Sequence, residues 1–98
     1  MKAYVIAIID VQDPARYADY VKLTPGTIEP YGGRFIARGG RSEKLEGEVA
    51  VNRVVVLEFP SYEQASAWYD CDGYRVAKAI RRSASTGNLL LVEGVPQA

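Results

Sequence analysis

Two stretches of this chain are apolar on both alternating faces, which is the pattern of strands covered on both sides. One covers residues 2–11, with Tyr4, Ile6, Ile8 and Asp10 on one face and Ala3, Val5, Ala7 and Ile9 on the other. The second covers residues 54–59, where only Glu58 interrupts the apolar run and Pro60 ends it. The pattern therefore predicts two central strands.

The residues after the first strand have helical spacing. Asp13 and Pro14 form an N-cap and first-turn pair. After them, apolar positions repeat at intervals of three and four, at Tyr17, Tyr20, Val21 and Thr24. Pro25 and Gly26 should kink or break this helix, because proline removes a backbone donor. We expect two helical pieces that end at Gly32 and Gly33, with the break at the rim of a cavity.

A second helical pattern follows the strand at residues 54–59. Ser61 and Gln64 have the spacing of a capping box, so the helix should begin near Ser61. Its apolar face carries Ala65, Trp68 and Tyr69. Asp72 and Gly73 interrupt the pattern, and a further helical face continues through Val76, Ala77, Ile80 and Ala84. Arg81 and Arg82 near its end suit a helix C-terminus, where we expect them to be solvated.

Two weaker strands complete the pattern. Residues 34–38 alternate in a way that places Arg34, Ile36 and Arg38 on one face, and Gly39 and Gly40 then turn the chain. Residues 41–52 are polar and form a long hairpin connection. Residues 88–93 supply the last strand.

This order predicts an α+β fold, the ferredoxin-like βαββαβ plait, as a single domain over residues 1–98. Its four-stranded antiparallel sheet carries helices on one face only. The other face would expose Ile6, Ile8, Val54 and Val56, which is too much apolar surface for a soluble monomer. We therefore expect a homodimer in which a second copy covers this face.

Composition narrows the possible functions. Lys plus Arg equals Asp plus Glu at 12 each, which argues against nucleic acid or an anionic membrane as a partner. The chain has no histidine, which removes imidazole bases and nearly all zinc sites, so we expect no metal and no cofactor. The single Cys71 and an opening segment that resembles neither a signal peptide nor a membrane span favour a cytoplasmic location.

The whole chain resembles the family called domain of unknown function 1330, within the dimeric α/β-barrel superfamily. The segments that carry the resemblance are YVIAIIDVQDP followed by Tyr17 and Tyr20, then YGGRFIARGG, RVVVLEFPS, AWYDCDGY and LLLVEGV. The resemblance implies a homodimer whose two sheets face each other around a barrel, and no assigned activity. Other members of the superfamily include monooxygenases acting on aromatic polyketides, haem-degrading enzymes, muconolactone-isomerase-like proteins and ligand-binding regulatory domains. The histidine ligands of the haem-dependent members are absent here.

The candidate chemistry lies on the face that the helices leave uncovered. Glu58 shares that face with Val54 and Val56 if the intervening residues face the helices. Arg38 on the neighbouring strand should stand close to it, and Asp10 and Tyr4 should project into the same space. Glu58 or Asp10 would be a base, Arg38 an anion clamp and a tyrosine a proton donor. The alternative is an ion pair between Glu58 and Arg38 that only satisfies two buried charges.

Four aromatic residues are candidate ligand contacts in the same pocket. They are Tyr17, Trp68, Tyr69 and Tyr74. Aromatic side chains at helical spacing more often belong to the hydrophobic core, so core packing is the competing interpretation.

Two functions are therefore compatible with the sequence. The first is a homodimeric protein that binds a small organic molecule between its sheets, with carboxylate-bearing molecules among the candidates. The second is a cofactor-independent enzyme of the monooxygenase or isomerase kind that uses Glu58 or Asp10 with Arg38.

Overall fold

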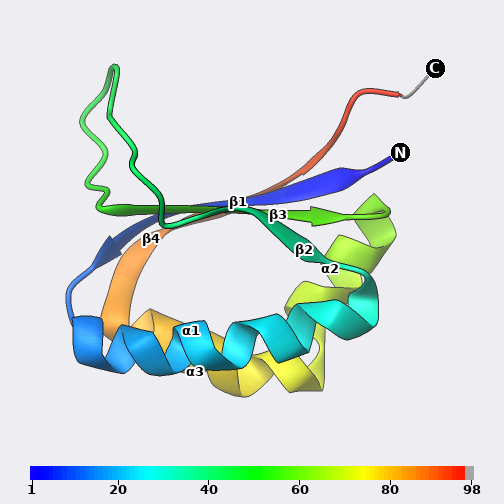
Figure 1. Cartoon of the computed structure of the whole chain (residues 1–98), viewed down its shortest axis with the longest axis horizontal. Coiled ribbons are helices and arrows are strands. Elements are labelled where there is room, and N and C mark those ends of the chain that lie inside the picture. Colours follow the sequence, from blue (N-terminus) through cyan, green and yellow to red (C-terminus); the bar gives the residue numbers. More distant parts are fainter. Residues whose placement is uncertain (97–98) are drawn as a thin grey trace.

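The computed structural model describes residues 1–96 and has the predicted plait (Figure 1). The elements are β1 (Ala3–Val11), α1 (Pro14–Ile28), the 3₁₀ turn η1 (Glu29–Tyr31), β2 (Arg34–Arg38), β3 (Arg53–Phe59), α2 (Tyr62–Asp70), α3 (Asp72–Ala84) and β4 (Ser85–Glu93). The strands form one antiparallel sheet in the order β2-β3-β1-β4. All three α-helices lie on the same side of this sheet. The predicted fold class is confirmed.

The two central strands alternate as their sequences indicate. In β1, Ala3, Val5 and Ile9 are buried against the helices, whereas Tyr4, Ile6 and Ile8 are half-buried on the opposite side. Ile6 lies between Val56 of β3 and Leu90 of β4 in the register of the sheet. The side without helices is called the open face below.

Helix α1 corrects one prediction. Asp13 caps it as expected, because its Oδ1 accepts from the backbone N–H of Arg16 at 3.1 Å. Pro25 does not break the helix, which continues to Ile28 before the 3₁₀ turn. Proline leaves the carbonyl four residues earlier, that of Val21, without its helical donor. A side chain from β2 donates to that carbonyl instead, as described below.

Helices α2 and α3 meet at a sharp corner at Cys71, whose backbone is extended. Ser61 caps α2 by accepting from the backbone N–H of Gln64 at 3.1 Å. Trp68 is completely buried and packs on Phe59 of β3 and Tyr74 of α3, with ring centroids 5.4 and 4.2 Å away. These aromatic side chains join the helices to the sheet.

Strand β4 begins at Ser85, three residues before the predicted start at Asn88, so it follows α3 without a loop. The Ser85 hydroxyl donates to the carbonyl of Arg81 at 2.7 Å and fixes this junction. None of the helices in residues 1–96 combines the length and hydropathy that crossing a membrane requires.

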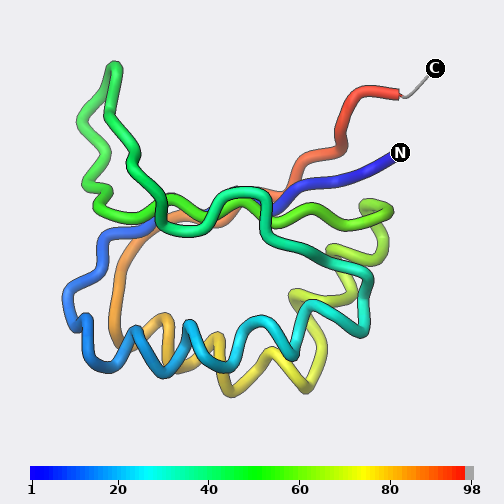
Figure 2. The backbone as a smooth tube through the Cα atoms, viewed as in Figure 1, coloured from blue at the N-terminus to red at the C-terminus, as the bar shows by residue number. Residues whose placement is uncertain are grey.

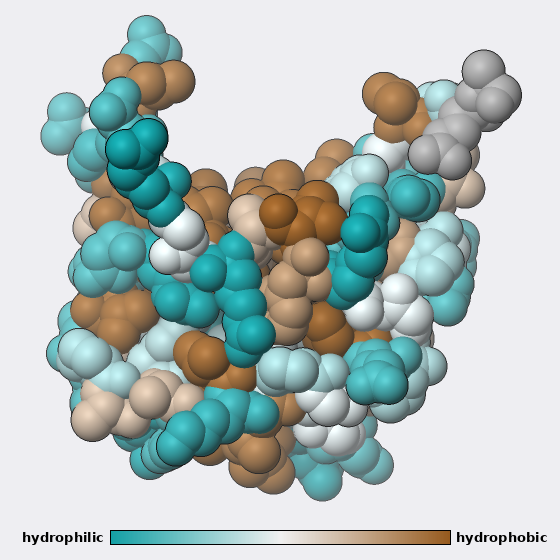
Figure 3. Space-filling view, viewed as in Figure 1, coloured by the Kyte–Doolittle hydropathy of each residue, from teal (hydrophilic) through white to brown (hydrophobic). Residues whose placement is uncertain are grey.

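Two segments project from the open face, away from the helices (Figure 2). One is the connection between β2 and β3, and the other is the chain that follows β4. Hydrophobic residues gather between these two projections (Figure 3). Ile36, Leu90 and Val92 are 46%, 58% and 46% exposed. The open face is therefore apolar and bordered by two arms.

Candidate functional site

A β-bulge in β2 decides where its two arginines point. Arg34 lies opposite Glu58 and Phe35 opposite Leu57, but the register then shifts, so that Arg38 lies opposite Val55. The bulge at Ile36 inserts one extra residue, which reverses the faces of the residues after it. Arg34 is therefore on the open face and Arg38 on the helix side. The prediction that both arginines share a face is wrong.

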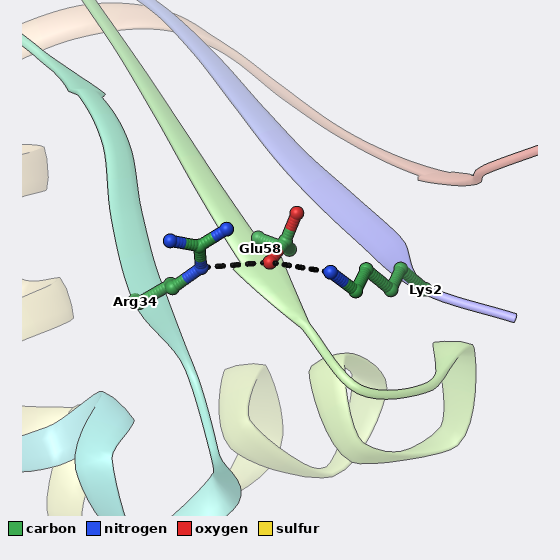
Figure 4. A network of polar contacts seen from close by, with 3 residues as sticks. All are labelled: Lys2, Arg34 and Glu58. Atoms are coloured by element: carbon green, nitrogen blue, oxygen red, sulfur yellow. Dashed lines mark hydrogen bonds and ion pairs between the residues drawn. The ribbon is translucent and has the colours of Figure 1, made fainter.

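Glu58 is consequently paired with Arg34 and not with Arg38 (Figure 4). Its Oε1 lies 2.7 Å from Nε of Arg34 and 3.5 Å from Nζ of Lys2. The hydrogen bond from Arg34 lowers the pKa of the Glu58 carboxyl. The predicted Glu58–Arg38 contact does not form, because the sheet separates the two side chains. An ion pair at Glu58 does exist, with different cationic partners.

The other candidates on the open face lie apart from Arg38 as well. Tyr4 is directly opposite Glu58 across β1 and β3, and Asp10 is farther along β1. The Asp10 carboxylate accepts from Nε2 of Gln12 at 3.2 Å. Tyr4, Asp10 and Glu58 therefore share a face, as predicted, but cannot reach a ligand group held by Arg38 on the other side of the sheet.

A cavity lies on the helix side instead. Only about 30 Å³ of it admits a sphere the size of a water molecule, so a larger ligand has to displace side chains that line it. All four strands form its roof, through Arg38, Val55, Ala7 and Leu89 from β2, β3, β1 and β4. Its floor comes from the three helices. The cavity thus borders all four strands, and we call it the helix-side cavity.

The floor of the helix-side cavity is largely aromatic. Tyr17 and Tyr20 of α1 and Trp68 of α2 line it. The Trp68 indole is fixed, since its Nε1–H donates to Oγ1 of Thr27 at 3.1 Å. Two sequence candidates, Tyr17 and Trp68, are therefore both core residues and cavity residues.

Three arginine residues, Arg38, Arg53 and Arg81, are among those that line this largely apolar cavity. Within residues 1–96, none of the three forms a salt bridge, and no Asp or Glu lines the cavity. A charge in an apolar site is costly unless a counter-charge or hydrogen bonds compensate for it. Arg38 is exposed, Arg53 is half-buried and Arg81 is buried, so Arg53 and Arg81 would gain most from an anion.

Arg38 is held in place by a hydrogen bond that the presence of Pro25 in α1 makes possible. Its Nη2 donates to the Val21 carbonyl at 2.8 Å, which is the carbonyl that Pro25 leaves without a helical donor. The guanidinium also lies over the Phe35 ring, 4.1 Å from its centroid. This anchor uses one N–H group and leaves the others available to a ligand.

Arg53 lies beside Arg38, because it is two residues before Val55, the residue opposite Arg38. Its guanidinium is over the Tyr17 ring, 5.3 Å from the centroid. Its Nε is buried and has no hydrogen-bond partner. Gly39 packs against this side chain so closely, with φ of +69°, that any Cβ there would collide with Arg53. An orphaned buried donor of this kind is uncommon in a folded protein.

Arg81 corrects the expectation of a solvated helix end, because it is only 7% exposed. Its Nε–H donates to the Tyr74 hydroxyl at 3.4 Å, and that hydroxyl lies 2.7 Å from the Tyr20 hydroxyl. Burial, followed by the neighbouring Tyr74, raises the pKa of Tyr20. Burial also raises the pKa of Tyr17, although Arg53 and Arg81 oppose this shift. The tyrosines at the cavity are neutral at physiological pH.

The remaining aromatic candidates are behind or beside the cavity. Tyr74 is completely buried and reaches the site through its bonds to Tyr20 and Arg81. Tyr69 lies on the α2 side, where Nη2 of Arg82 donates to its hydroxyl at 3.4 Å.

Two cavity arginines were missed by the sequence analysis although signals existed. Arg53 has the same strand parity as Val55, Leu57 and Phe59, which the alternation places against the helices. Arg81 follows Ala77 by four residues and precedes Ala84 by three, so helical spacing puts it on the buried face of α3.

The family model for a domain of unknown function, DUF1330, matches residues 2–95. The chain belongs to this family. No curated protein matches it. Among residues 1–96, no group of three or more histidine, cysteine or acidic side chains is arranged to hold a metal ion.

Solved structures share the fold of this DUF1330 chain at low sequence identity. RPA0582, a protein of unknown function from Rhodopseudomonas palustris, has a TM-score of 0.77 at 17% identity, covering 98% of this chain and 84% of its own. SnoaB, a cofactor-independent oxygenase from Streptomyces nogalater, has a TM-score of 0.65 at 14% identity and covers 98% and 95%. Rv0793 from Mycobacterium tuberculosis has a TM-score of 0.57 at 16% identity and covers 100% and 99%. The chain thus shares the four-stranded α+β fold of these structures.

Proposed function

We propose that this DUF1330 protein binds a small organic acid in the helix-side cavity. The observation that carries the proposal is that three arginine residues and no acidic residue among residues 1–96 line a largely apolar cavity. The proposed site lies between the sheet and the helices of one chain, whereas the sequence suggested a site between two sheets.

Arg38 and Arg53 are the residues that bind the acidic group in this proposal. They come from neighbouring strands and lie side by side, and Arg53 has a buried Nε–H to donate. A carboxylate can accept two parallel hydrogen bonds from one guanidinium, which gives both affinity and orientation. Tyr17 and Trp68 supply the flat apolar contacts for the body of the ligand.

Calorimetric titration with small aromatic acids such as 2-naphthoate tests the proposal. Arg38→Met and Arg53→Met should each weaken binding by about tenfold or more, since each removes a charge-assisted hydrogen bond. Arg34→Met is the matched control, because Arg34 is on the same strand as Arg38 but faces the other side of the sheet. Equal losses in Arg34→Met and Arg38→Met would contradict the proposal.

Cofactor-independent catalysis in the same cavity is a second candidate function. Two features favour it: the likeness to a cofactor-independent oxygenase and the hydrogen-bonded series Arg81–Tyr74–Tyr20, which could stabilise an oxyanion. Glu58 and Asp10 would not be the base for a ligand held by Arg38, because they lie on the open face.

The proposed reaction is an oxygenation of the ligand. It converts a CH₂ group and O₂ into a carbonyl group and water, so all atoms balance without a further reductant. Oxygen-electrode measurements with hydroxylated aromatic ketones test it, with Tyr74→Phe as the variant that removes the central hydroxyl. Uptake that requires the Tyr74 hydroxyl supports catalysis. If no ligand that binds causes oxygen uptake, the catalytic proposal fails and binding remains the proposed function.

We also propose that the chain is a homodimer joined through the open face. Half-buried Ile6 and Val56 and exposed Leu90 and Val92 form an apolar surface there, bordered by two projecting arms. Such a surface is unfavourable in water, and a two-fold related copy would cover it. Glu58 with Arg34 and Lys2 would then be a polar contact at the interface. Sedimentation equilibrium tests this proposal by giving the mass in solution.

A further inference from the structure

The free space inside the helix-side cavity is small and well enclosed. About 30 Å³ of it admits a sphere the size of a water molecule, which is enough for one or two particles of that size. Of the residues among 1–96 that line the cavity, only Arg38 is exposed. As it stands, the space therefore accommodates a water molecule or a monatomic ion.

Arg81 brings a positive charge to this space. Its side chain is buried and keeps its charge at any accessible pH. Its Nε–H donates to the Tyr74 hydroxyl at 3.4 Å, which is longer than an ordinary hydrogen bond. Within residues 1–96 it forms no salt bridge. A guanidinium withdrawn from water to this degree gains from an anionic partner.

Arg53 adds a second charge and a donor without a partner. Its Nε is buried and forms no hydrogen bond in the part of the chain that the structure describes. Its guanidinium lies over the Tyr17 ring, 5.3 Å from the centroid, so the ring compensates for only part of the charge. Leaving a buried N–H unpaired costs free energy. A ligand that accepts from this N–H removes that cost.

The two guanidinium groups lie near the same phenol. Burial raises the pKa of Tyr17, and Arg53 and Arg81 both oppose that rise. Such opposition requires both charges to be close to the Tyr17 hydroxyl. That hydroxyl is protonated at physiological pH, so it is a further donor for an anion. No Asp or Glu among residues 1–96 lines the cavity.

Size and charge together distinguish the candidate occupants. A water molecule fits and accepts from Nε–H of Arg53, but it is neutral and leaves both charges without a counter-charge. An organic acid supplies the charge, but it is larger than the free space. A chloride ion is only slightly larger than a water molecule, carries a negative charge and accepts several hydrogen bonds at once.

We propose that the helix-side cavity binds a monovalent anion of the size of chloride between Arg53 and Arg81. The Nε–H of Arg53 and the guanidinium of Arg81 hold the ion, and the apolar residues around it exclude water. This inference goes beyond the proposed organic-acid function, because it needs no organic ligand and no displacement of side chains.

Anomalous diffraction from crystals grown in sodium bromide tests the position of the site. Bromide replaces chloride chemically and has a strong anomalous signal, which water lacks. An anomalous peak should lie in the cavity, within hydrogen-bonding distance of Arg53 and Arg81. Electron density there without an anomalous signal would identify water as the occupant and overturn the proposal.

Line widths of ³⁵Cl NMR signals in sodium chloride test binding in solution. Chloride in exchange with the protein should have an excess line width that saturates with concentration. Arg53→Met should weaken this binding by about tenfold or more, since it removes a charge-assisted hydrogen bond. Circular dichroism shows whether the variant is folded, and the bromide measurement on the unmodified protein does not depend on it.

Arg75→Met is the matched control, because Arg75 is exposed and is paired with Asp72 at 3.4 Å. It should bind chloride as the unmodified protein does. Equal losses in Arg75→Met and Arg53→Met would mean that surface charge alone attracts the ion, which overturns the proposal. A bromide peak in the cavity without saturable chloride binding in solution would mean an adventitious ion only, and it would overturn the proposal as well. These outcomes are independent of whether 2-naphthoate binds.

Discussion

Single residues set the chemistry of the helix-side cavity, and Pro25 is the clearest case. Its missing N–H leaves the Val21 carbonyl free, and that carbonyl accepts from Arg38 at 2.8 Å. Pro25, which the sequence pattern predicts to break the helix, therefore helps to position the cationic side chain of Arg38 beside the cavity. The helix itself continues because its remaining contacts outweigh one lost hydrogen bond.

Pro25→Ala should separate stability from binding. Alanine supplies an N–H for the Val21 carbonyl, so the free energy of unfolding rises by about 1 kcal/mol. The same hydrogen bond competes with Arg38 for the Val21 carbonyl and loosens its anchor, so the affinity for 2-naphthoate falls severalfold. Urea unfolding and calorimetry measure the two effects. Leu23→Ala, at an exposed position of α1, serves as the control. An affinity that does not change would show that the carbonyl has no role in positioning Arg38.

Alkaline pH should unfold the protein through its buried tyrosines. Burial raises the pKa of Tyr17 and Tyr20 in the folded state. A group whose folded pKa is raised stabilises the fold fully below its unfolded pKa, about 10 for tyrosine, and this contribution is lost as the pH rises above it.

Absorbance at 295 nm, followed during a pH titration, checks this prediction. Tyr17 and Tyr20 should ionise only together with the loss of helical circular dichroism, and Tyr20→Phe should remove one of these late ionisations. Ionisation of all seven tyrosines in the folded protein would contradict it.

At the scale of elements, the bulge in β2 decides which arginine meets Glu58. Alternation alone put Arg34 and Arg38 on one face, and the inserted Ile36 separates them. The Glu58 carboxyl therefore has its pKa lowered by Arg34 on the open face. A lowered folded pKa means that Glu58 stabilises the fold above its unfolded pKa, about 4.3, and that this contribution is lost as the pH falls through the lower folded value.

An NMR titration of the Glu58 side chain in two variants tests this arrangement. Arg34→Ala should raise the Glu58 pKa toward its ordinary range, because it removes the hydrogen bond that lowers it. Arg38→Ala should leave the Glu58 pKa unchanged. The opposite result would restore the pairing that simple alternation implied.

The strand and helix patterns made the fold predictable from sequence, but not the position of the site. The alternation in β1 and the cap at Ser61 led directly to the plait. The sequence around Ile36 contains no glycine or turn residue that would indicate a bulge. The side of the sheet on which Arg38 lies could therefore not be predicted. Arg53 and Arg81 carried the right periodicity, yet their charge favoured a solvated position until their surroundings were visible.

At the scale of the whole molecule, the sheet separates two surfaces with different roles. The helix side contains the cationic cavity, and the open face is apolar and bordered by arms. A partner copy and a ligand would therefore occupy opposite sides of the same sheet. The partner would contact strands that also form the roof of the cavity.

Val56→Asp should weaken the proposed dimer. Val56 lies at the centre of the open face, opposite Ile6, and a carboxylate buried there at an interface has no cationic partner directly across from it. Sedimentation equilibrium should give a dimer for the unmodified protein and a concentration-dependent shift toward the monomer for the variant. Asp19→Asn, on the exposed surface of α1, is the control. A wild-type chain that is monomeric at micromolar concentration would contradict the dimer.

The most direct test of the central claim is an NMR titration of the ¹⁵N-labelled protein with 2-naphthoate. Trp68 is the only tryptophan and lines the helix-side cavity, so its indole N–H is a single reporter. We predict large shifts for this signal and for the Nε–H signals of Arg38 and Arg53, with little change at Ile6, Val54 and Glu58. Shifts concentrated on the open face, with Trp68 unaffected, would contradict it.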